Sequence, residues 1–386
     1  MTSDDDRATG PADEDRPEVL RGLTDEEAVD AFAVVGHELR RKSPARRALE
    51  GLGSLAVVVI IFAFVIPKVT GSDYASIWHE ITNLDRPEIA LLLALWLLGM
   101  LAYTGVLTNT LRGLTHGKAL VVNFAGSAVS NVMPFGGAVG VGATYAIDMS
   151  WGFTPPAITI SILVSGVWNV FAKLGMPIIA LVLVLLTGES NGRLVIPTVI
   201  GLVALVTAVT LIALVLRSER LAVAIGTFGQ RVVGALARLF RRHHTPDVVD
   251  AVLDFRHNSI GLVRTKWLPI TFWVLTFNGM QYLLLLACVR AIGVENVGWA
   301  EVFAAFAFAR LLETVPITPS GVGFVEAGAA SALIAFGGGD AASAAAVFLY
   351  RGFVWLLEIP VGAVAWVVWA TARSWRRPVG WYRPSD

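Results

Sequence analysis

Charged residues and cysteine are scarce in this chain of 386 residues. Only 16% of its residues are charged and 55% are hydrophobic, whereas an average soluble domain has about 25% charged residues. The mean hydropathy of +0.66 is also far from that of a soluble globule, and we do not expect one. The single cysteine, Cys288, excludes an intramolecular disulfide and a cysteine-rich metal site, and its apolar surroundings indicate a core residue.

Motifs for metal and nucleotide chemistry are missing as well. All histidines lie outside the long apolar runs, so no HExxH-type zinc site is expected within a membrane. The chain has no Walker A pattern, which excludes ATP hydrolysis by this chain alone. We therefore expect no metal, no cofactor, no nucleic-acid partner and no enzymatic activity. Acid–base catalysis by Glu313 and Glu326 is the one enzymatic alternative left open.

The chain is rich in long apolar runs. A helix needs about 20 apolar residues to cross the hydrocarbon core of a bilayer. The runs that qualify are roughly 48–67, 88–111, 156–187, 194–216, 267–290 and 342–371. We therefore predict an all-α polytopic membrane protein.

Two further apolar stretches, 118–150 and 299–338, are interrupted by proline and glycine. The first break is Met133–Gly137 and the second is Pro316–Gly323. Each half is too short to span, and broken backbone at membrane depth must be covered by protein or water. The pattern predicts two re-entrant broken-helix hairpins, and a pair of kinked ordinary helices is the alternative.

The distribution of Lys and Arg predicts the orientation of the spans. The loops on one side carry twenty of these residues and those on the other side carry four. The basic loops include both ends of the membrane part, so we expect both termini to be cytoplasmic in a multi-pass protein of the cell membrane. With this topology the two hairpins enter from opposite faces of the bilayer.

The two halves of the membrane part are predicted to be inverted copies. A shift of 185 positions carries Pro134 onto Pro319 and Lys173 onto Glu358. Inverted repeats with broken helices near the midplane are typical of alternating-access transporters. Because a lone charge at that depth is costly, we expect Lys173 and Glu358 to form a charge pair across the repeats. Pairing of Glu358 with Arg351 is the alternative.

Three segments flank or interrupt the membrane domain, which we place at residues 45–372. Residues 1–44 form an acidic tail, expected to be disordered apart from a possible short helix. Residues 373–386 form a basic cytoplasmic tail. The insert at 217–266 has an apolar stripe beside arginines, which predicts a cytoplasmic hairpin on anionic lipid, with docking of a partner as the alternative.

Charges inside membrane segments indicate function, and several flank the second break. Arg310 and Glu313 share one helical face, and mutual neutralisation that holds the shape of the hairpin is the alternative to a binding role. A helix that starts at mid-membrane points free N–H groups into the cavity, where they favour an anion. The predicted substrate-binding residues are Arg310, Glu313, Thr318, Ser320, Gly321, Gly323, Glu326, Arg351 and, from the first hairpin, Asn131. A tight turn or close helix packing is the alternative reading of the glycines and small polar residues.

The segments SNVMPFGGAVG, PITPSGVGFVEAGAASAL and LYRG carry a family resemblance. Over roughly residues 45–372 the chain resembles the lysylphosphatidylglycerol synthase transmembrane (flippase-like) family. The resemblance implies movement of phospholipids or lipid-linked molecules between leaflets, and Glu326 and Arg351 match the family's acidic and basic motif residues. Only fourteen residues follow Ala372. We therefore expect a stand-alone member without the aminoacyl-transferase domain.

The leading hypothesis is an ATP-independent lipid flippase or transporter. Its partners are expected to be membrane lipids with anionic or zwitterionic headgroups, with a partner enzyme or a homo-oligomer as further possibilities. Two other classes stay open: an accessory membrane protein that docks a lipid-processing enzyme, and an ion-coupled transporter of small solutes.

Overall fold

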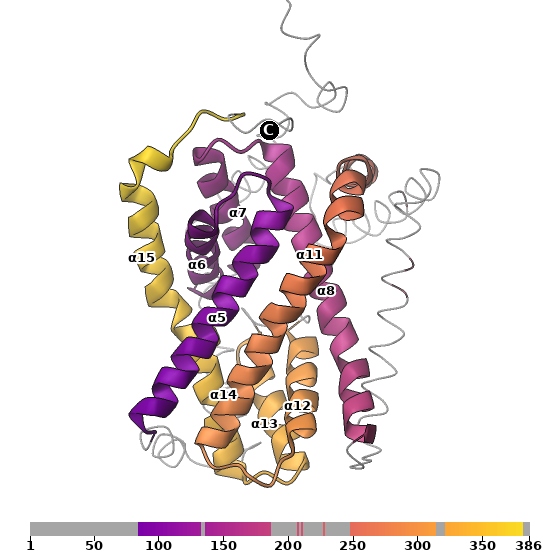
Figure 1. Ribbon diagram of the computed structural model, residues 1–386, viewed down its shortest axis with the longest axis vertical. Coiled ribbons are helices and arrows are strands. Elements are labelled where there is room, and N and C mark those ends of the chain that lie inside the picture. Colours follow the sequence, from indigo (N-terminus) through magenta and orange to yellow (C-terminus); the bar gives the residue numbers. More distant parts are fainter. Residues whose placement is uncertain are drawn as a thin grey trace, which may run out of the picture.

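A computed structural model describes residues 84–132, 136–186, 248–313 and 321–380, together with the single positions 207, 210 and 227. Several predictions lie outside these residues: the acidic tail, the spans at 48–67 and 194–216, and most of the insert at 217–266. The tips of both interrupted stretches, residues 133–135 and 314–320, lie outside them too. Nearly all of the described chain is helical (Figure 1).

Four stretches of helix are long and apolar enough to cross a membrane: Arg86–Thr110, Pro155–Val184, Leu262–Ala291 and Asp340–Thr371. The first is α5; the second lies in α8 (Pro155–Leu186) and the third in α11 (Val248–Ala291). The fourth joins α14 (Asp340–Arg351), the π-helix η5 (Gly352–Leu356) and α15 (Glu358–Thr371). These stretches confirm the predicted spans at 88–111, 156–187, 267–290 and 342–371. A short 3-10 helix, η6 (Arg373–Trp375), follows α15.

Each interrupted stretch forms two separate helices. The first stretch gives α6 (His116–Val132) and α7 (Gly136–Ser150), and the second gives α12 (Trp299–Leu312) and α13 (Phe324–Ala335). The helices of each pair pack against each other. In Figure 1 the α6–α7 pair occupies the upper half of the molecule and the α12–α13 pair the lower half. The two helical pairs therefore lie in opposite halves of the same bundle.

Glycines bring the helices of the upper half into backbone contact. A side chain at Gly362 of α15 would clash with the Phe124 carbonyl and the Ala128 methyl group of α6. A side chain at Gly140 of α7 would clash with Ser130 of α6. Small residues of this kind allow close approach of helices in a membrane. As a result α15 lies along α6, which places the start of α15 beside the end of α6.

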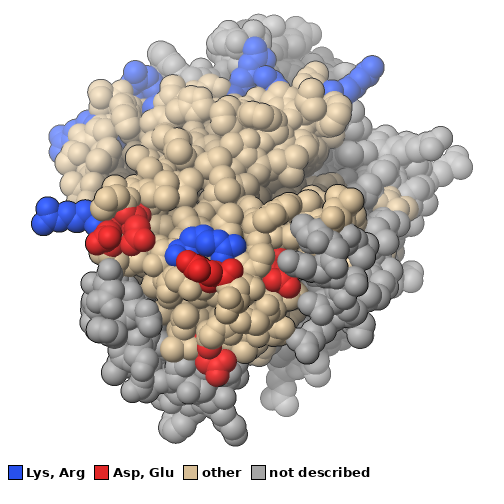
Figure 2. All heavy atoms as spheres, turned by 60° about the horizontal axis from the view of Figure 1, so that its bottom comes forward, with Lys and Arg blue, Asp and Glu red and all other residues tan. Residues whose placement is uncertain are grey.

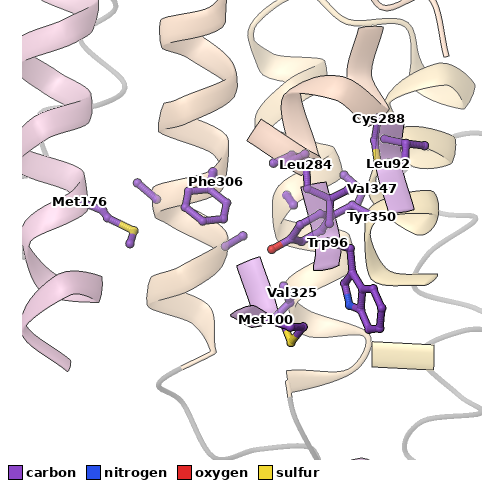
Figure 3. Packing of buried hydrophobic residues seen from close by; sticks show 14 of the residues in the cluster. Leu92, Trp96, Met100, Met176, Leu284, Cys288, Phe306, Val325, Val347 and Tyr350 are labelled. Atoms are coloured by element: carbon purple, nitrogen blue, oxygen red, sulfur yellow. The ribbon is translucent and has the colours of Figure 1, made fainter. Parts of the chain in front are cut away.

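The lower half packs around alanine-rich helices. Ala304, Ala305 and Ala307 of α12 are all buried, and Phe306 fills the space beside them. Figure 3 shows this region, where buried side chains of α5, α11, α13 and α14 lie around α12. Cys288 of α11 is fully buried in the same cluster, which confirms the prediction of a core residue.

The two ends of the bundle differ in charge. The lower end holds the start of α5 and the end of α11, with the bases Arg86 and Arg290. Figure 2 looks onto this end and shows a mainly uncharged surface with small groups of acidic and basic side chains. The links and helix ends at the upper end carry more bases: Arg112, Lys118, Arg373, Arg376 and Arg377. The described residues thus have the asymmetry expected from the positive-inside rule.

Candidate functional site

A cavity of about 270 Å³ lies where the ends of several helices meet near the middle of the bundle. We call it the charged cavity. Its described lining consists of Asn131, Lys173, Phe277, Gln281, Arg310, Glu313, Tyr350, Arg351, Val354, Trp355 and Glu358. The lining therefore combines side chains from both halves of the chain. Most of the charges predicted to be functional border this cavity.

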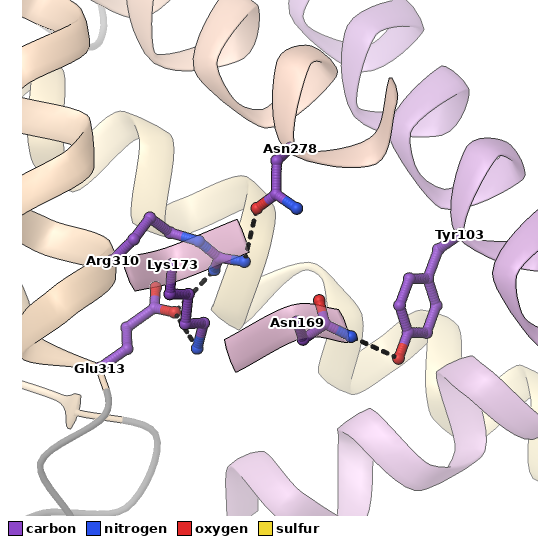
Figure 4. A network of polar contacts seen from close by, with 6 residues as sticks. All are labelled: Tyr103, Asn169, Lys173, Asn278, Arg310 and Glu313. Atoms are coloured by element: carbon purple, nitrogen blue, oxygen red, sulfur yellow. Dashed lines mark hydrogen bonds and ion pairs between the residues drawn. The ribbon is translucent and has the colours of Figure 1, made fainter. Parts of the chain in front are cut away.

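One wall of the charged cavity is a three-residue ion network, shown in Figure 4. The Glu313 carboxylate accepts hydrogen bonds from Arg310 at 2.6 Å and from the Lys173 ammonium at 3.0 Å. A second nitrogen of Arg310 donates to the Asn278 side-chain oxygen at 3.1 Å. The prediction that Arg310 and Glu313 share one face is confirmed, and α8 adds a second cation to their pair.

A second ion pair anchors α13 to α14. The Arg351 Nε donates to Glu326 at 2.7 Å, and both side chains are over nine-tenths buried. The other Glu326 oxygen accepts the Gly323 N–H at 2.7 Å, at the start of α13. Gly323 has a φ of +86°, which favours glycine at this turn. Glu326 thus fixes the start of α13 and orients Arg351 towards the cavity.

The third carboxylate, Glu358, meets the end of α6. Asn131 donates to the Trp355 carbonyl at 3.2 Å and to Glu358 at 3.4 Å. The π-helix η5 precedes Glu358, and its Leu357 N–H bonds back to the Gly352 carbonyl. Single π-helical turns widen a helix and are frequent at functional sites. This turn lies where the span borders the cavity.

The predicted charge pair between Lys173 and Glu358 is wrong. Both residues line the charged cavity, but the Lys173 ammonium pairs with Glu313, and Glu358 contacts Asn131. The alternative pairing of Glu358 with Arg351 is not formed as an ion pair among the described residues; the Arg351 Nε bonds to Glu326. The repeat register relates Lys173 to Glu358 along the chain, but in space Glu313, at the end of α12, is the carboxylate that reaches the Lys173 ammonium.

The expectation that Arg310, Glu313 and Glu326 share one cavity is correct only for the first two. Glu326 is 3% exposed and is not part of the described cavity lining. The predicted use of the Gly323 N–H for an anion is also wrong in this structure, because Glu326 accepts that N–H. Gly321 lies outside the lining as well, and Thr318 and Ser320 lie outside the described residues.

Sequence reasoning missed several lining residues, above all Trp355. Its indole Nε1 and the Arg310 Nε are buried and have no hydrogen-bond partner among the described residues. Buried donors are almost always paired, so two of them around one cavity indicate a missing acceptor. The signals available in the sequence were the amides of Asn278 and Gln281, which interrupt an otherwise apolar run.

A second cavity, of about 300 Å³, lies in the upper half between α5, α6, α7 and α8. We call it the hydroxyl cavity. Its polar side chains are Tyr103, Asn123, Ser127, Ser130, Asn131, Thr144, Asp148, Ser161 and Ser165. Asn131 lines both cavities. A further polar link runs along α8, where Asn169 donates to the Tyr103 hydroxyl at 3.5 Å, one turn from Lys173 (Figure 4).

The bundle, its apolar spans and its polar midlevel cavities define a multi-pass helical membrane protein. Residues 51–362 match the family described as the lysylphosphatidylglycerol synthase TM region. The chain belongs to this family, as its motifs predicted. No curated protein matches the chain.

Proposed function

We propose that the protein moves a membrane lipid between leaflets without ATP, with the lipid headgroup held in the charged cavity. Membership of a lipid-related membrane family supports this function. The observation that carries it is the pair of unpartnered buried donors, the Arg310 Nε and the Trp355 Nε1, on a cavity near mid-depth. A phosphate oxygen is an acceptor that would satisfy both.

The ion pairs of the cavity suit a transported headgroup better than a permanently bound one. The Glu313 carboxylate pairs with both Lys173 and Arg310 when no lipid is present, which stabilises the two cations but leaves a net positive charge for an anion. An entering phosphate would exchange with Glu313 on Arg310, while Lys173 keeps the carboxylate. We propose that Arg351 adds positive charge to the site, while Glu326 holds it in position.

The architecture proposed for this movement is an inverted repeat with two re-entrant hairpins. The helical pairs α6–α7 and α12–α13 occupy opposite halves of the bundle, as such a repeat requires (Figure 1). The basic residues at the upper end support a cytoplasmic location for that end and for both termini. The two hairpins would then enter from opposite leaflets and meet at the charged cavity, which is the arrangement of alternating-access transporters.

We propose a transporter rather than an enzyme. The carboxylates Glu313 and Glu326, for which acid–base catalysis was left open above, are both held in ion pairs. This pairing supports a binding role for the first and a positioning role for the second. Membrane lipids are then the partners, and any docking enzyme or second copy of the chain would be an addition to this function.

The test is lipid exchange in vesicles that contain the purified full chain and a fluorescent phospholipid in one leaflet. The wild-type protein should exchange the lipid faster than empty vesicles do. Arg310→Gln should slow exchange about 10-fold or more, because it removes charge-assisted hydrogen bonds to phosphate. Arg264→Gln, the same change at an exposed position of α11, is the control and should exchange lipid at the wild-type rate.

Two results would contradict the proposal. Exchange no faster than in empty vesicles, together with co-purification of a lipid-processing enzyme, would favour the accessory role. Uptake of a small solute driven by an ion gradient, without lipid exchange, would favour the ion-coupled solute transporter.

A further inference from the structure

The hydroxyl cavity contains a buried acceptor without a donor. Asp148 of α7 lines this cavity and is 3% exposed. One of its carboxylate oxygens, Oδ1, has no hydrogen-bond partner among the described residues. An ionised carboxylate accepts hydrogen bonds but donates none, and leaving a buried acceptor oxygen unsatisfied is costly. The chemistry required of a ligand here is therefore hydrogen-bond donation, the opposite of that required in the charged cavity.

The surroundings of Asp148 favour a neutral donor over a cation. Burial is the larger influence on the charge of Asp148, and Lys118 of α6 interacts with it electrostatically as the second. The rest of the polar lining consists of hydroxyl and amide groups, including Ser130 and Thr144. Hydroxyls and amides both donate and accept, which matches the hydroxyl groups of a sugar or polyol. Tyr103 adds an aromatic side chain to the same wall.

The cavity also has open space beside its polar groups. A methyl group added at Gly166 of α8 would meet no atom within 4 Å, and Gly166 lines the cavity. The cavity lies next to the charged cavity, because Asn131 lines both. A phosphate in the charged cavity and a hydroxyl-bearing group attached to it can thus occupy neighbouring sites.

We infer that the hydroxyl cavity binds a neutral polyhydroxyl group, a sugar or polyol carried on a lipid phosphate, with Asp148 accepting its hydroxyl hydrogens. This inference rests on the proposed function, because it names the substrate class of the same transporter. It assigns phosphate recognition to the charged cavity and headgroup selection to the hydroxyl cavity.

The experiment measures binding of short-chain lipids to the full chain in nanodiscs. The probes are phosphatidylinositol, phosphatidylglycerol and phosphatidylmethanol, which share one anionic phosphodiester but differ in headgroup hydroxyls; free inositol is a fourth probe. The two hydroxyl-bearing lipids should bind about 10-fold tighter than phosphatidylmethanol, as expected for a hydrogen bond to a buried carboxylate. Free inositol should bind much more weakly than phosphatidylinositol, because it lacks the phosphate.

Two variants test the site. Asp148→Asn should remove most of the preference, because an amide has one acceptor oxygen in place of two. Gly166→Leu should abolish the preference by filling the cavity, and leucine also favours the helix more than glycine does. The matched control is Gly279→Leu in α11, where an added methyl group also meets no atom within 4 Å but which borders neither cavity. This control should keep the wild-type preference.

Leaflet exchange of the same lipids separates the two proposals. Equal binding of all three lipids, or a preference that survives both variants, would overturn the inference. If the lipids then still exchange between leaflets, the proposed function stands without it. If the preference depends on Asp148 but no lipid exchanges, the polyol site stands and the transport function fails. Binding of free inositol as tight as that of phosphatidylinositol would overturn the assignment to a lipid.

Discussion

The charged cavity and the hydroxyl cavity have similar volumes, about 270 and 300 Å³, but opposite chemistry. The first is bordered by paired charges, and two of its donors, Arg310 Nε and Trp355 Nε1, have no acceptor among the described residues. The second is bordered by hydroxyls, and one of its acceptors, Asp148 Oδ1, has no donor in the same part of the chain. The comparison indicates that one bundle holds two complementary half-sites, one for an anion and one for its uncharged substituent.

Positions that are related by the predicted shift of 185 residues carry different side chains in the two cavities. Arg351 borders the charged cavity, and its counterpart Gly166 borders the hydroxyl cavity. Glu313 corresponds to Ala128, which packs against α15, and Asp148 corresponds to the fully buried Leu333. The residues at these related positions thus differ in charge and size. A repeat of this kind would give both cavities a similar frame while each half evolved its own chemistry.

The largest expected effect is a difference in protein stability between a variant of the charged cavity and a variant of the hydroxyl cavity. Glu313→Gln leaves Lys173 and Arg310 without their shared carboxylate; because these side chains are 12–20% exposed, we expect a loss of about 3 kcal/mol, the lower end of the range for a buried ion pair. Asp148→Asn should cost little, because Asp148 has an oxygen that is already unpartnered. Thermal unfolding in one detergent measures both, with the exposed Glu295→Gln as the control. Equal losses for Glu313→Gln and Asp148→Asn would contradict the contrast between the cavities.

The next effect concerns the residue behind the charged cavity. Glu326→Gln retains an oxygen for the Gly323 N–H but weakens the bond to Arg351, and hydrogen bonds to charged groups contribute about 1.5–3 kcal/mol. We expect normal expression, a lower unfolding temperature and slower lipid exchange. The defect should be the same for phosphatidylmethanol and phosphatidylinositol, since Glu326 orients a phosphate-binding residue. A defect confined to phosphatidylinositol would place Glu326 in headgroup selection instead.

A smaller effect distinguishes the observed pairing of Lys173 with Glu313 from its predicted pairing with Glu358. In a double-mutant cycle, Lys173→Met and Glu313→Gln should show a coupling of about 0.5–3 kcal/mol, as residues in one ion network do. The cycle of Lys173→Met with Glu358→Gln should be close to additive. Unfolding free energies of the three single variants, the two double variants and the wild type provide both couplings. A larger coupling for the second cycle would restore the pair across the repeats.

The smallest effect is expected where the cavities join. Asn131→Ala removes hydrogen bonds to Glu358 and to the Trp355 carbonyl, and a neutral hydrogen bond contributes about 0.5–1.5 kcal/mol. Exchange of all lipids should fall modestly, because Asn131 borders both cavities. Asn169→Ala, one turn from Lys173, is the comparison and should have less effect. A greater loss of lipid exchange in Asn169→Ala than in Asn131→Ala would indicate that the two cavities meet at α8 and not at Asn131.

The helices were predictable because the bilayer constrains them. Apolar length predicted the spans in α5, α8, α11 and α14–α15, and the proline-glycine breaks predicted the separation of α6 from α7 and of α12 from α13. The presence of charged residues around the cavity was also predictable, since a charged side chain at membrane depth is costly and usually has a function.

The partners of these charges were not predictable. Glu313 pairs with Lys173, which lies 140 positions earlier in the chain, because the end of α12 approaches α8. No periodicity in the sequence contains that contact. The unpartnered atoms of Trp355 and Asp148 were hidden for the same reason, because an orphaned donor or acceptor is defined by its neighbours in space.

The most direct test of the central claim is an experimental structure of the full chain in nanodiscs with phosphatidylinositol. The account predicts the lipid phosphate within hydrogen-bond distance of the Arg310 Nε and the Trp355 Nε1, and the inositol ring against Asp148. A headgroup bound outside both cavities, with these three atoms bonded to other protein groups, would contradict it.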